Sequence, residues 1–160
     1  MFVSKLMSTL VIGITLVTSG AFAQNTTQAL KCPAGTTQFG TAKDGLFCRK
    51  PGVKDGAFTA HGPYAAYHAN GQKSTEGQYS DGFRSGSWTF YNEAGQLSER
   101  IDFQGGNYHG QRVAYFPNGK PRVVESYMEG KRNGLMQEFS EDGKLVRQVT
   151  YRDGQQLAAK

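Results

Sequence analysis

Residues 86–95 read GSWTFYNEAG, and residues 110–119, twenty-four positions later, read GQRVAYFPNG. Outward from these two segments, glycine and aromatic residues recur every 24 positions through four copies, with no insertion or deletion. The recurring glycines are Gly62, Gly86, Gly110 and Gly134; Gly71, Gly95, Gly119 and Gly143; and Gly82, Gly106, Gly130 and Gly154. A fixed period of this length indicates a tandem-repeat protein whose units stack on their neighbours.

Two of the three glycine series predict turns. Asn70-Gly71 and its equivalents are typical of tight hairpin turns, because both central residues can take positive φ; Ala94-Gly95 is the weaker member. Asp81-Gly82 and its equivalents mark the second turn of each unit. The third series, Gly62 and its equivalents, is expected just before the next strand begins. Glycine there would relieve a strained backbone or allow a neighbouring strand to approach closely.

Between the turns, apolar and polar residues alternate, as Ile101 and Phe103 do with Arg100 and Asp102. A period of two indicates half-buried β-strands, so each unit reads as a β-hairpin plus a connecting turn. Short connections require consecutive strands to pair. We therefore expect an all-β fold, an elongated and twisted antiparallel β-meander of about eight strands. Its four tandem repeats would span 61–84, 85–108, 109–132 and 133–160.

Aromatic residues keep the same register and predict two stripes, one of Tyr67, Tyr91, Tyr115 and Phe139 and one of Tyr79, Phe103, Tyr127 and Tyr151. We expect these rings to form the core, because a thin repeat protein has little else to bury. The alternative is a stacking platform for a sugar or a peptide. Another position of the unit varies from copy to copy, which suggests a surface location. This variable position is occupied by Tyr64, Trp88 and Arg112 in the first three repeats. With the cations Lys131 and Arg132 of the third repeat, these are the candidate contact residues.

The first 23 residues differ from the remainder of the chain. Lys5 is their only charge, residues 6–17 are mostly apolar, and Ala21 and Ala23 supply a small-x-small cleavage pattern. This predicts a secretory signal peptide over residues 1–23. The apolar run is shorter than the roughly 20 residues that a membrane-spanning helix needs. The mature protein is therefore expected to be exported, in the periplasm of a bacterium or outside the cell, and not to span the membrane.

Cys32 and Cys48 are the two cysteines of the chain. In an oxidising compartment we expect a disulfide, which would contribute about 3 kcal/mol by closing a short loop. Their spacing is not that of a Cys-x-x-Cys motif and no histidine cluster accompanies them, which disfavours a redox or metal pair. Residues 24–60 are thus predicted to form a small N-terminal cap, with a strand over 46–50 and a turn over 54–56 that imitates a repeat turn.

Composition limits the function classes. The sequence has 21 glycines, 12% aromatic residues and 19% charged residues, which is unlike a disordered chain. The net charge is +5, but both signs are mixed along the chain and residues 61–109 carry −2. Nucleic-acid binding would need basic residues gathered on one face. An anionic envelope surface would attract a protein of this charge.

The sequence shows no pattern that predicts catalysis. It contains no Gly-x-Ser-x-Gly, His-Glu-x-x-His or phosphate-binding loop. His61 and His109 precede the repeat glycine at positions where the other copies have Ser85 and Asn133, a pattern that suits a polar turn residue better than a metal ligand. We therefore expect a non-enzymatic protein without catalytic residues, metal or cofactor.

Taken together, the two quoted segments, the short segments His-Gly-Pro-Tyr at 61–64 and His-Gly at 109–110, and the fourfold register resemble MORN repeats, and more closely the bacterial MORN-like repeats of the YwqK antitoxin family. The resemblance covers about 61–154. It implies a repetitive β-sheet and a role in protein–protein contacts, or in association with lipid headgroups or membranes. This chain departs from the family in its signal peptide and its cysteine-bearing cap.

We expect an exported, non-catalytic repeat protein that acts as a protein-interaction module in the cell envelope. One alternative is a binder of an envelope ligand, an anionic lipid or a glycan, through Trp88, Lys131 and Arg132. Another is an antitoxin-like inhibitor of an exported toxin. The C-terminal edge of the sheet would be open to a partner or a second copy.

Overall fold

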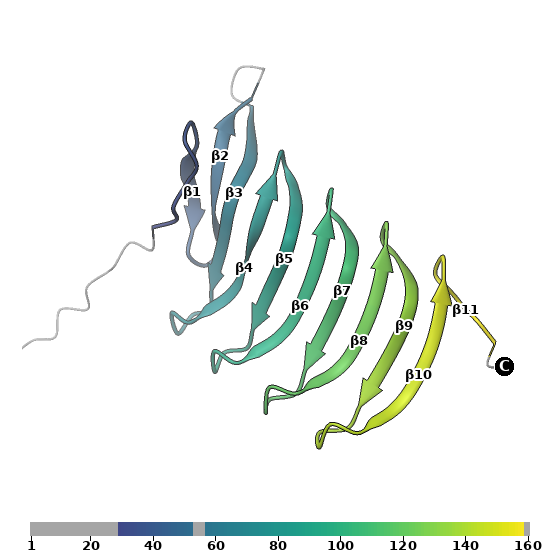
Figure 1. The fold of residues 1–160 in the computed structure, drawn as a ribbon. Coiled ribbons are helices and arrows are strands. Elements are labelled where there is room, and N and C mark those ends of the chain that lie inside the picture. Colours follow the sequence, from purple (N-terminus) through teal and green to yellow (C-terminus); the bar gives the residue numbers. More distant parts are fainter. Residues whose placement is uncertain (1–28, 53–56, 159–160) are drawn as a thin grey trace, which may run out of the picture.

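The computed structural model describes residues 29–52 and 57–158, and over these ranges it contains strands and no helix. Eleven strands form one open antiparallel sheet, in which the order in space follows the order in the chain (Figure 1). The strands are β1 (Thr37–Thr41), β2 (Gly45–Pro51), β3 (Phe58–Tyr67), β4 (Lys73–Ser80), β5 (Phe83–Tyr91), β6 (Leu97–Gln104), β7 (Asn107–Tyr115), β8 (Pro121–Met128), β9 (Lys131–Phe139), β10 (Leu145–Arg152) and β11 (Gln155–Gln156). The predicted all-β meander is confirmed.

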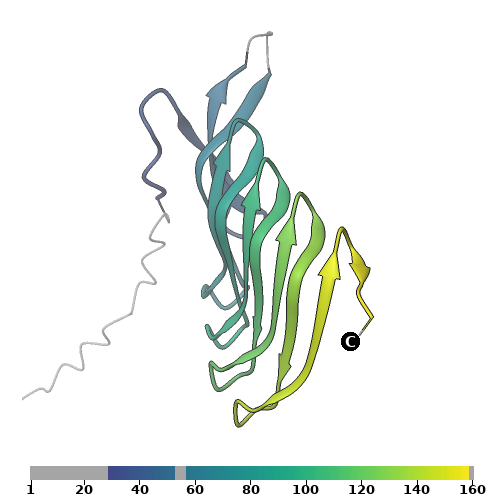
Figure 2. The ribbon, with the colours of Figure 1, turned by 45° about the vertical axis from the view of Figure 1, so that its right-hand side comes forward.

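Strands β3 to β10 correspond to the four repeats, and β1 and β2 belong to the N-terminal cap. Strands β5, β7 and β9 begin at Phe83, Asn107 and Lys131, at the spacing of the repeat. The sheet is a single elongated layer, and its strands curve along their length (Figure 2). Within the described residues no helix is long and apolar enough to cross a membrane. The predicted signal peptide (1–23) and the predicted turn over 54–56 lie outside the described residues.

The two turns of each unit differ in backbone conformation. Positive φ at both central residues was predicted for the Asn-Gly turns but is found in the other series. Positive φ at both central residues occurs in the two-residue turns, such as Gly105-Gly106 (55° and 82°) and Glu129-Gly130 (51° and 81°). In the Asn-Gly turns only the glycine has positive φ, as at Gly119 (82°). These turns are longer loops in which Phe116 N–H donates to the Lys120 carbonyl (2.9 Å) and Gly119 N–H to the Phe116 carbonyl (2.9 Å). The asparagine side chain accepts a local hydrogen bond in this loop, Lys120 N–H to Asn118 Oδ1 (2.9 Å), an interaction typical of asparagine in turns.

The third glycine series lies inside strands and not before them. Gly62, Gly86, Gly110 and Gly134 belong to β3, β5, β7 and β9, and all four have positive φ, between 67° and 113°. At each of them the register with the preceding strand shifts; for example, Ile101 pairs with Arg112 whereas Phe103 pairs with Tyr108. Each is therefore the glycine of a β-bulge, which bends the strand.

The bulge explains why a glycine series and an aromatic series share one period. Across the following hairpin, each bulge glycine pairs with an aromatic residue: Gly62 with Tyr79, Gly86 with Phe103, Gly110 with Tyr127 and Gly134 with Tyr151. A Cβ added at Gly110 or Gly134 would meet Asp102 or Ser126 of the preceding strand and not the paired ring, so the glycine is required by the positive φ of the bulge. Glycine and aromatic ring are thus one structural pair repeated four times.

Neighbouring units are also joined along both long edges of the sheet. On one edge, the glycine N–H of each two-residue turn donates to a carbonyl of the preceding unit, as Gly106 does to Arg84 (3.0 Å) and Gly130 to Tyr108 (2.9 Å). On the other edge, Asn118 Nδ2 donates to the Glu141 carbonyl of the next loop (3.0 Å). These bonds are nearest-neighbour contacts, as expected where each repeat depends on the adjacent ones.

The core is a chain of aromatic rings on one face of the sheet, which we call the ring face. Trp88 is fully buried, and Ile101 and Phe103 form a buried cluster with it. Ring centroids lie 5.0–6.1 Å apart along the series Tyr64, Trp88, Phe103, Tyr108 and Tyr127, with Tyr79 packed against both Tyr64 and Trp88. Most of these pairs are edge-to-face, a preferred arrangement for aromatic rings.

The surface prediction for Trp88 and its equivalents was therefore wrong. Trp88 lies inside the core, Tyr64 packs on it at 5.0 Å, and Arg112 is half-buried in ion pairs. The position varies between copies because it is matched to the residue that pairs with it on the next strand. Trp88 pairs with Ile101, whereas Arg112 pairs with Glu125.

The two predicted aromatic stripes have different environments. Tyr79, Phe103 and Tyr127 belong to the chain of rings. The Arg132 guanidinium lies over the Tyr151 ring, with its carbon 5.4 Å from the ring centroid. The residues of the other stripe are half-buried, and each is the last residue of its strand, before a longer loop: Tyr67, Tyr91, Tyr115 and Phe139. There, for example, Tyr91 donates its hydroxyl hydrogen to Glu76 (2.6 Å).

The N-terminal cap is tied to the sheet by the predicted disulfide, Cys32–Cys48. Cys48 is fully buried, and Leu46 and Ala65 are buried beside it on the face opposite the rings. A Cβ added to Gly62 would lie 2.6 Å from Pro33 Cδ, so the segment before β1 packs closely on β3. The cap thus covers this opposite face at one end of the sheet.

Candidate interaction surface

Large apolar side chains remain exposed in the cap, beside two-residue turns and toward the C-terminal end of the sheet. In the cap, Phe39 is 46% exposed and Phe58 is 50% exposed. Elsewhere, the exposed large apolar residues among those described are Phe83, Met128, Leu135, Leu145, Val146 and Leu157. Aromatic side chains are enriched where proteins bind one another, so the cap is the first place to look for a contact surface.

Phe39, Phe47, Arg49 and Phe58 form a contiguous cluster, which we call the cap patch. The Phe39 and Phe47 centroids lie 5.7 Å apart, and Phe58 lies 6.1 Å from each. The Arg49 guanidinium carbon lies 3.9 Å from the Phe39 centroid and 5.1 Å from the Phe58 centroid. The cation is therefore held against two half-exposed rings, a favourable cation–π arrangement.

The disulfide determines which side chains reach the cap patch. Successive residues of a strand point to opposite faces. Because Cys48 is buried on one face and bonded to Cys32, its neighbours Phe47 and Arg49 must point to the other. The β1–β2 register then places Phe39 opposite Phe47, and the β2–β3 register places Phe58 opposite Pro51. A local cross-link and two hairpin registers thus gather the three rings and Arg49.

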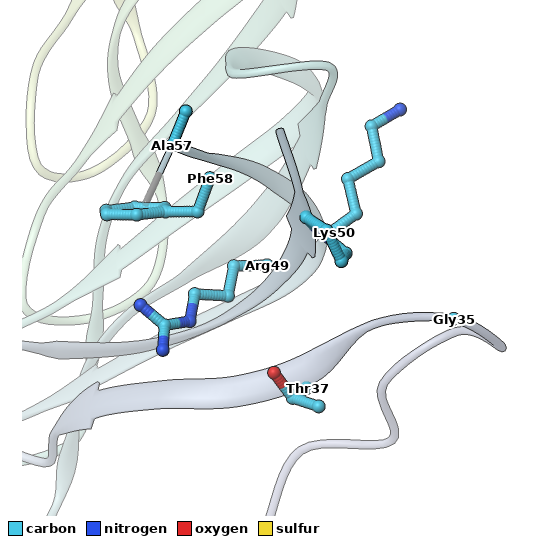
Figure 3. A pocket seen from close by; sticks show the side chains of 7 residues that line it. Gly35, Thr37, Arg49, Lys50, Ala57 and Phe58 are labelled. Carbon is cyan, nitrogen blue, oxygen red and sulfur yellow. The ribbon is translucent and has the colours of Figure 1, made fainter. Parts of the chain in front are cut away.

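A shallow cleft of about 310 Å³ lies beside the patch. It is lined by Gly35, Thr37, Arg49, Lys50, Pro51, Ala57 and Phe58. Figure 3 shows the Arg49 side chain and the Phe58 ring extending to the same side of the hairpin, while Lys50 extends away from them. The lining contains two cations and no carboxylate among the described residues.

The two cations of this lining differ in their partners. The Lys50 ammonium forms an ion pair and hydrogen bond with Asp81, which also contacts His61 Nδ1 at 3.2 Å. This hydrogen bond from Lys50, together with its charge, lowers the pKa of the exposed Asp81 carboxyl. Arg49, by contrast, has no carboxylate within ion-pair distance in the described part of the chain. Arg49 is therefore the cation that a partner would meet.

A second depression lies where residues 29–31 approach strands β3 to β5. Its lining includes Leu30, Tyr67, Glu76 and Thr89. Glu76 accepts hydrogen bonds from Lys73 (2.6 Å) and Tyr91 (2.6 Å). The bond from Lys73 is the main cause that lowers the pKa of Glu76, and the bond to Glu76 raises the pKa of Tyr91 to about 12. Glu76 already has two partners, so this triad is a self-contained interaction.

In the C-terminal half of the ring face, charged groups take the place of rings. Glu125 is 2% exposed and accepts hydrogen bonds from Arg112 (2.6 Å) and Arg132 (2.7 Å). Arg112 also pairs with Glu99. The carboxylates raise the pKa of Arg112 despite the opposing effect of its burial. Two arginines and two glutamates balance in charge, so the cluster offers no free charge to a ligand.

The predicted contact residues are thus dispersed. Trp88 and Tyr64 are in the core, Arg112 and Arg132 pair with Glu125, and only Lys131 is exposed without an ion pair in the described residues. The sequence analysis missed Phe39, Arg49 and Phe58. No sequence signal marked them, because they lie in the cap, outside the repeat register, and on three different strands.

The histidines and the acidic residues that the structure describes are not gathered as a metal site. No group of three or more His, Cys, Asp or Glu side chains in the described ranges could hold a metal ion. His61 contacts Asp81, and His68 Nε2 lies 2.9 Å from the Tyr91 carbonyl oxygen. His109 lines a shallow polar depression with Gln104, Asn107 and Glu129.

Comparison with known families supports a MORN-like repeat protein. The MORN repeat variant family matches residues 108–128 and 132–153, in the third and fourth units. The match covers little more than a quarter of the chain. The first two units share the strands, bulges and turns of the matched ones. No curated protein matches the sequence.

Proposed function

We propose that this chain is an exported, non-catalytic repeat protein that acts as a protein-interaction module in the cell envelope. The observation that carries the proposal is the cap patch, where Phe39 and Phe58 remain half-exposed although the repeats bury their own largest rings. Covering the exposed halves, about 100 Å² each, would contribute roughly 2–3 kcal/mol per ring at about 25 cal/mol per Å². A partner could recover this free energy.

The repeats suit a supporting role in such a module. Their turns are hydrogen-bonded to neighbouring units along both edges of the sheet, which holds the cap on an extended frame. The cap disulfide is compatible with an oxidising compartment, which accords with export. The predicted signal peptide supplies the other argument for the same location.

Binding of an anionic lipid or a glycan has less support than the sequence suggested. That alternative depended on Trp88, Lys131 and Arg132, but Trp88 is buried and Arg132 is paired with Glu125, which leaves Lys131 as its exposed cation without an ion pair in the described residues. Inhibition of an exported toxin, suggested by the resemblance to the YwqK antitoxin family, is a special case of protein interaction. It would require a toxic partner that binds this chain.

Chemical cross-linking in the native compartment tests the proposal. The full chain carrying an affinity tag is treated with an amine-reactive cross-linker in intact cells and then purified under denaturing conditions. We expect a reproducible adduct with another protein that is absent from an untagged control. Absence of any protein adduct, together with co-sedimentation of the chain with anionic vesicles or with envelope glycan, would contradict the proposal.

A further inference from the structure

We propose that the cap patch recognises an acidic peptide segment, in which a carboxylate binds Arg49 and an adjacent apolar side chain packs on Phe39 and Phe58. The inference deepens the proposed function and rests on it. It names the chemistry of the partner and the residues that select it. The cap patch lies before the first repeat, so it is independent of what the repeats bind.

The first argument is the state of the Arg49 guanidinium. Its Cζ atom lies over the Phe39 ring and near the Phe58 ring, at 3.9 and 5.1 Å from the ring centroids. A guanidinium presents five N–H donors at its edge, in a fork that matches both oxygens of a carboxylate. In the described chain no hydrogen bond or ion pair uses the donors of Arg49. Contact with the two rings holds the group in place, and its N–H donors are left for an anion.

The second argument is a contrast with other cations of the protein. Arg112 and Arg132, on the same face farther along the sheet, both bind Glu125. Lys50, next to Arg49 in the sequence, binds Asp81 and extends away from the ring (Figure 3). Arg49 is the member of this group whose charge is not compensated within the described residues. A bidentate carboxylate contact makes two charge-assisted hydrogen bonds, each roughly twice as strong as a neutral one.

The third argument concerns the apolar neighbours of that cation. Phe39 and Phe58 are about half-exposed, and the adjoining cleft has small or apolar walls at Gly35, Pro51 and Ala57. Its volume of about 310 Å³ is at the lower end of ligand pockets, roughly 300–1,000 Å³. A cleft of this size suits a side chain or two of a peptide. Carboxylate and apolar side chain should therefore be neighbours in the bound segment.

An anionic membrane shares part of this chemistry but fits the observations less well. Each basic residue near such a surface contributes only about 1 kcal/mol, and lipid-binding sequences gather several of them. The cleft offers Arg49 alone, because Lys50 is held by Asp81. The rings also pack on one another, with centroids about 6 Å apart, and do not project singly as interfacial anchors do. These observations favour a protein segment.

Selection from a displayed library of random 12-residue peptides tests the proposal. The full chain is the target, and two libraries are compared, one panned on the wild-type chain and one on Phe58→Ser. We expect wild-type selection to enrich peptides with Asp or Glu next to Leu, Phe, Tyr or Trp, and the Phe58→Ser selection not to enrich them. Enrichment of peptides without acidic residues, or the same peptides from both targets, would overturn the inference.

Affinities of one selected peptide then separate the roles of the residues. Arg49→Gln should weaken binding at least tenfold, Arg49→Lys less, and substitution of the peptide Asp or Glu by its amide should match Arg49→Gln. The controls are Phe83→Ser, an exposed phenylalanine outside the patch, and Arg122→Gln, an exposed arginine in β8. Both should bind as the wild type does. Far-UV circular dichroism of each variant checks that it is folded.

A vesicle-binding experiment distinguishes an anionic membrane from a peptide as the ligand of the cap patch. We expect the chain to stay in solution with phosphatidylglycerol–phosphatidylcholine vesicles at moderate salt. If the wild-type chain co-sediments with the vesicles and both Arg49→Gln and Phe58→Ser abolish this, the ligand of the patch is a membrane and the inference is overturned. If instead cross-linking finds a protein partner whose binding is unaffected by Phe58→Ser, the proposed function survives and the assignment of this patch fails.

Discussion

The two halves of the repeat sheet share one backbone and differ in the row of side chains at their centre. In the N-terminal half, paired strands bring together Tyr64 with Gly77 and Trp88 with Ile101. In the C-terminal half, the same positions bring together Arg112 with Glu125 and Met136 with Val149. The first row is packed by rings, and the second is held by a buried carboxylate and two arginines.

This difference indicates that the fold is specified mainly by turns and bulges. All four units keep the bulge glycine and the aromatic residue paired with it. The central row can then exchange apolar contacts for ion pairs, provided that both members of a cross-strand pair change together. Where Trp88 occupies the row, a Cβ at Gly77 would overlap its ring, so the glycine opposite makes room for the tryptophan.

Removal of Trp88 is expected to produce the largest loss of stability. Trp88→Ala deletes a fully buried ring that contacts Tyr64, Tyr79 and Phe103, and should lower the free energy of unfolding by about 3–5 kcal/mol. Urea denaturation followed by far-UV circular dichroism measures the change. Trp88→Phe, which keeps a ring, should lose clearly less. A loss below 1 kcal/mol for Trp88→Ala would show that the ring face is not the core.

Removal of Glu125 should have a smaller effect in the other half. Glu125→Ala leaves Arg112 and Arg132 without their shared carboxylate, and breaking a buried pair costs about 3–5 kcal/mol. Both arginines are partly exposed and Arg112 keeps Glu99, so we expect about 2 kcal/mol. The same denaturation experiment measures it. Glu99→Ala serves as the comparison and should cost less, because Glu99 is more exposed than Glu125.

Transfer of the N-terminal row into the C-terminal half sharpens the comparison. The double variant Arg112→Trp with Glu125→Ile copies Trp88 and Ile101 into their equivalent positions. Ile101 lies beside residue 112, at the position where Gly77 makes room for Trp88, so we expect the double variant to be less stable than the wild type by about 1–2 kcal/mol, a usual cost of overpacking. Either single substitution should be worse than the pair. A double variant that fails to fold would mean that the two halves are not interchangeable.

A smaller effect is expected at the two-residue turns. Glu129 has φ of 51°, where its equivalent in the N-terminal half is Gly105 with φ of 55°. A left-handed conformation costs a residue with a side chain roughly 1–2 kcal/mol, offset in part by the flexibility of glycine in the unfolded chain. Glu129→Gly should therefore raise stability by about 0.5 kcal/mol, measured by thermal unfolding. The converse change, Gly105→Glu, should lower it.

The last prediction concerns alkaline pH and should affect stability least. The hydrogen bond to Glu76 raises the pKa of Tyr91 to about 12, above its ordinary 10.0. The stability from this bond is therefore complete below pH 10 and is lost as the pH rises through about 12. Glu76→Gln should move the Tyr91 titration toward its ordinary range. Ultraviolet difference titration at the phenolate band, with Tyr91→Phe to identify the signal, measures the shift; an unchanged titration would contradict the assigned bond.

The cap shows where prediction from the sequence ended. Its disulfide was expected from two cysteines and a predicted export signal, because an oxidising compartment would leave the cysteines one partner each. The cap patch did not follow, because Phe39, Arg49 and Phe58 lie on three strands and outside the repeat register. Only strand pairing places them together.

The sequence by itself determined the period, the strand order and the positions of the turns, because each depends on residues close together in the chain. Glycine, asparagine and aspartate act through local φ and local hydrogen bonds, and alternation acts over one strand. The tertiary structure alone decided which face is buried and which charges are compensated. It placed Trp88 inside and left Arg49 without a carboxylate in the described residues, because burial and charge pairing depend on side chains that meet across strands.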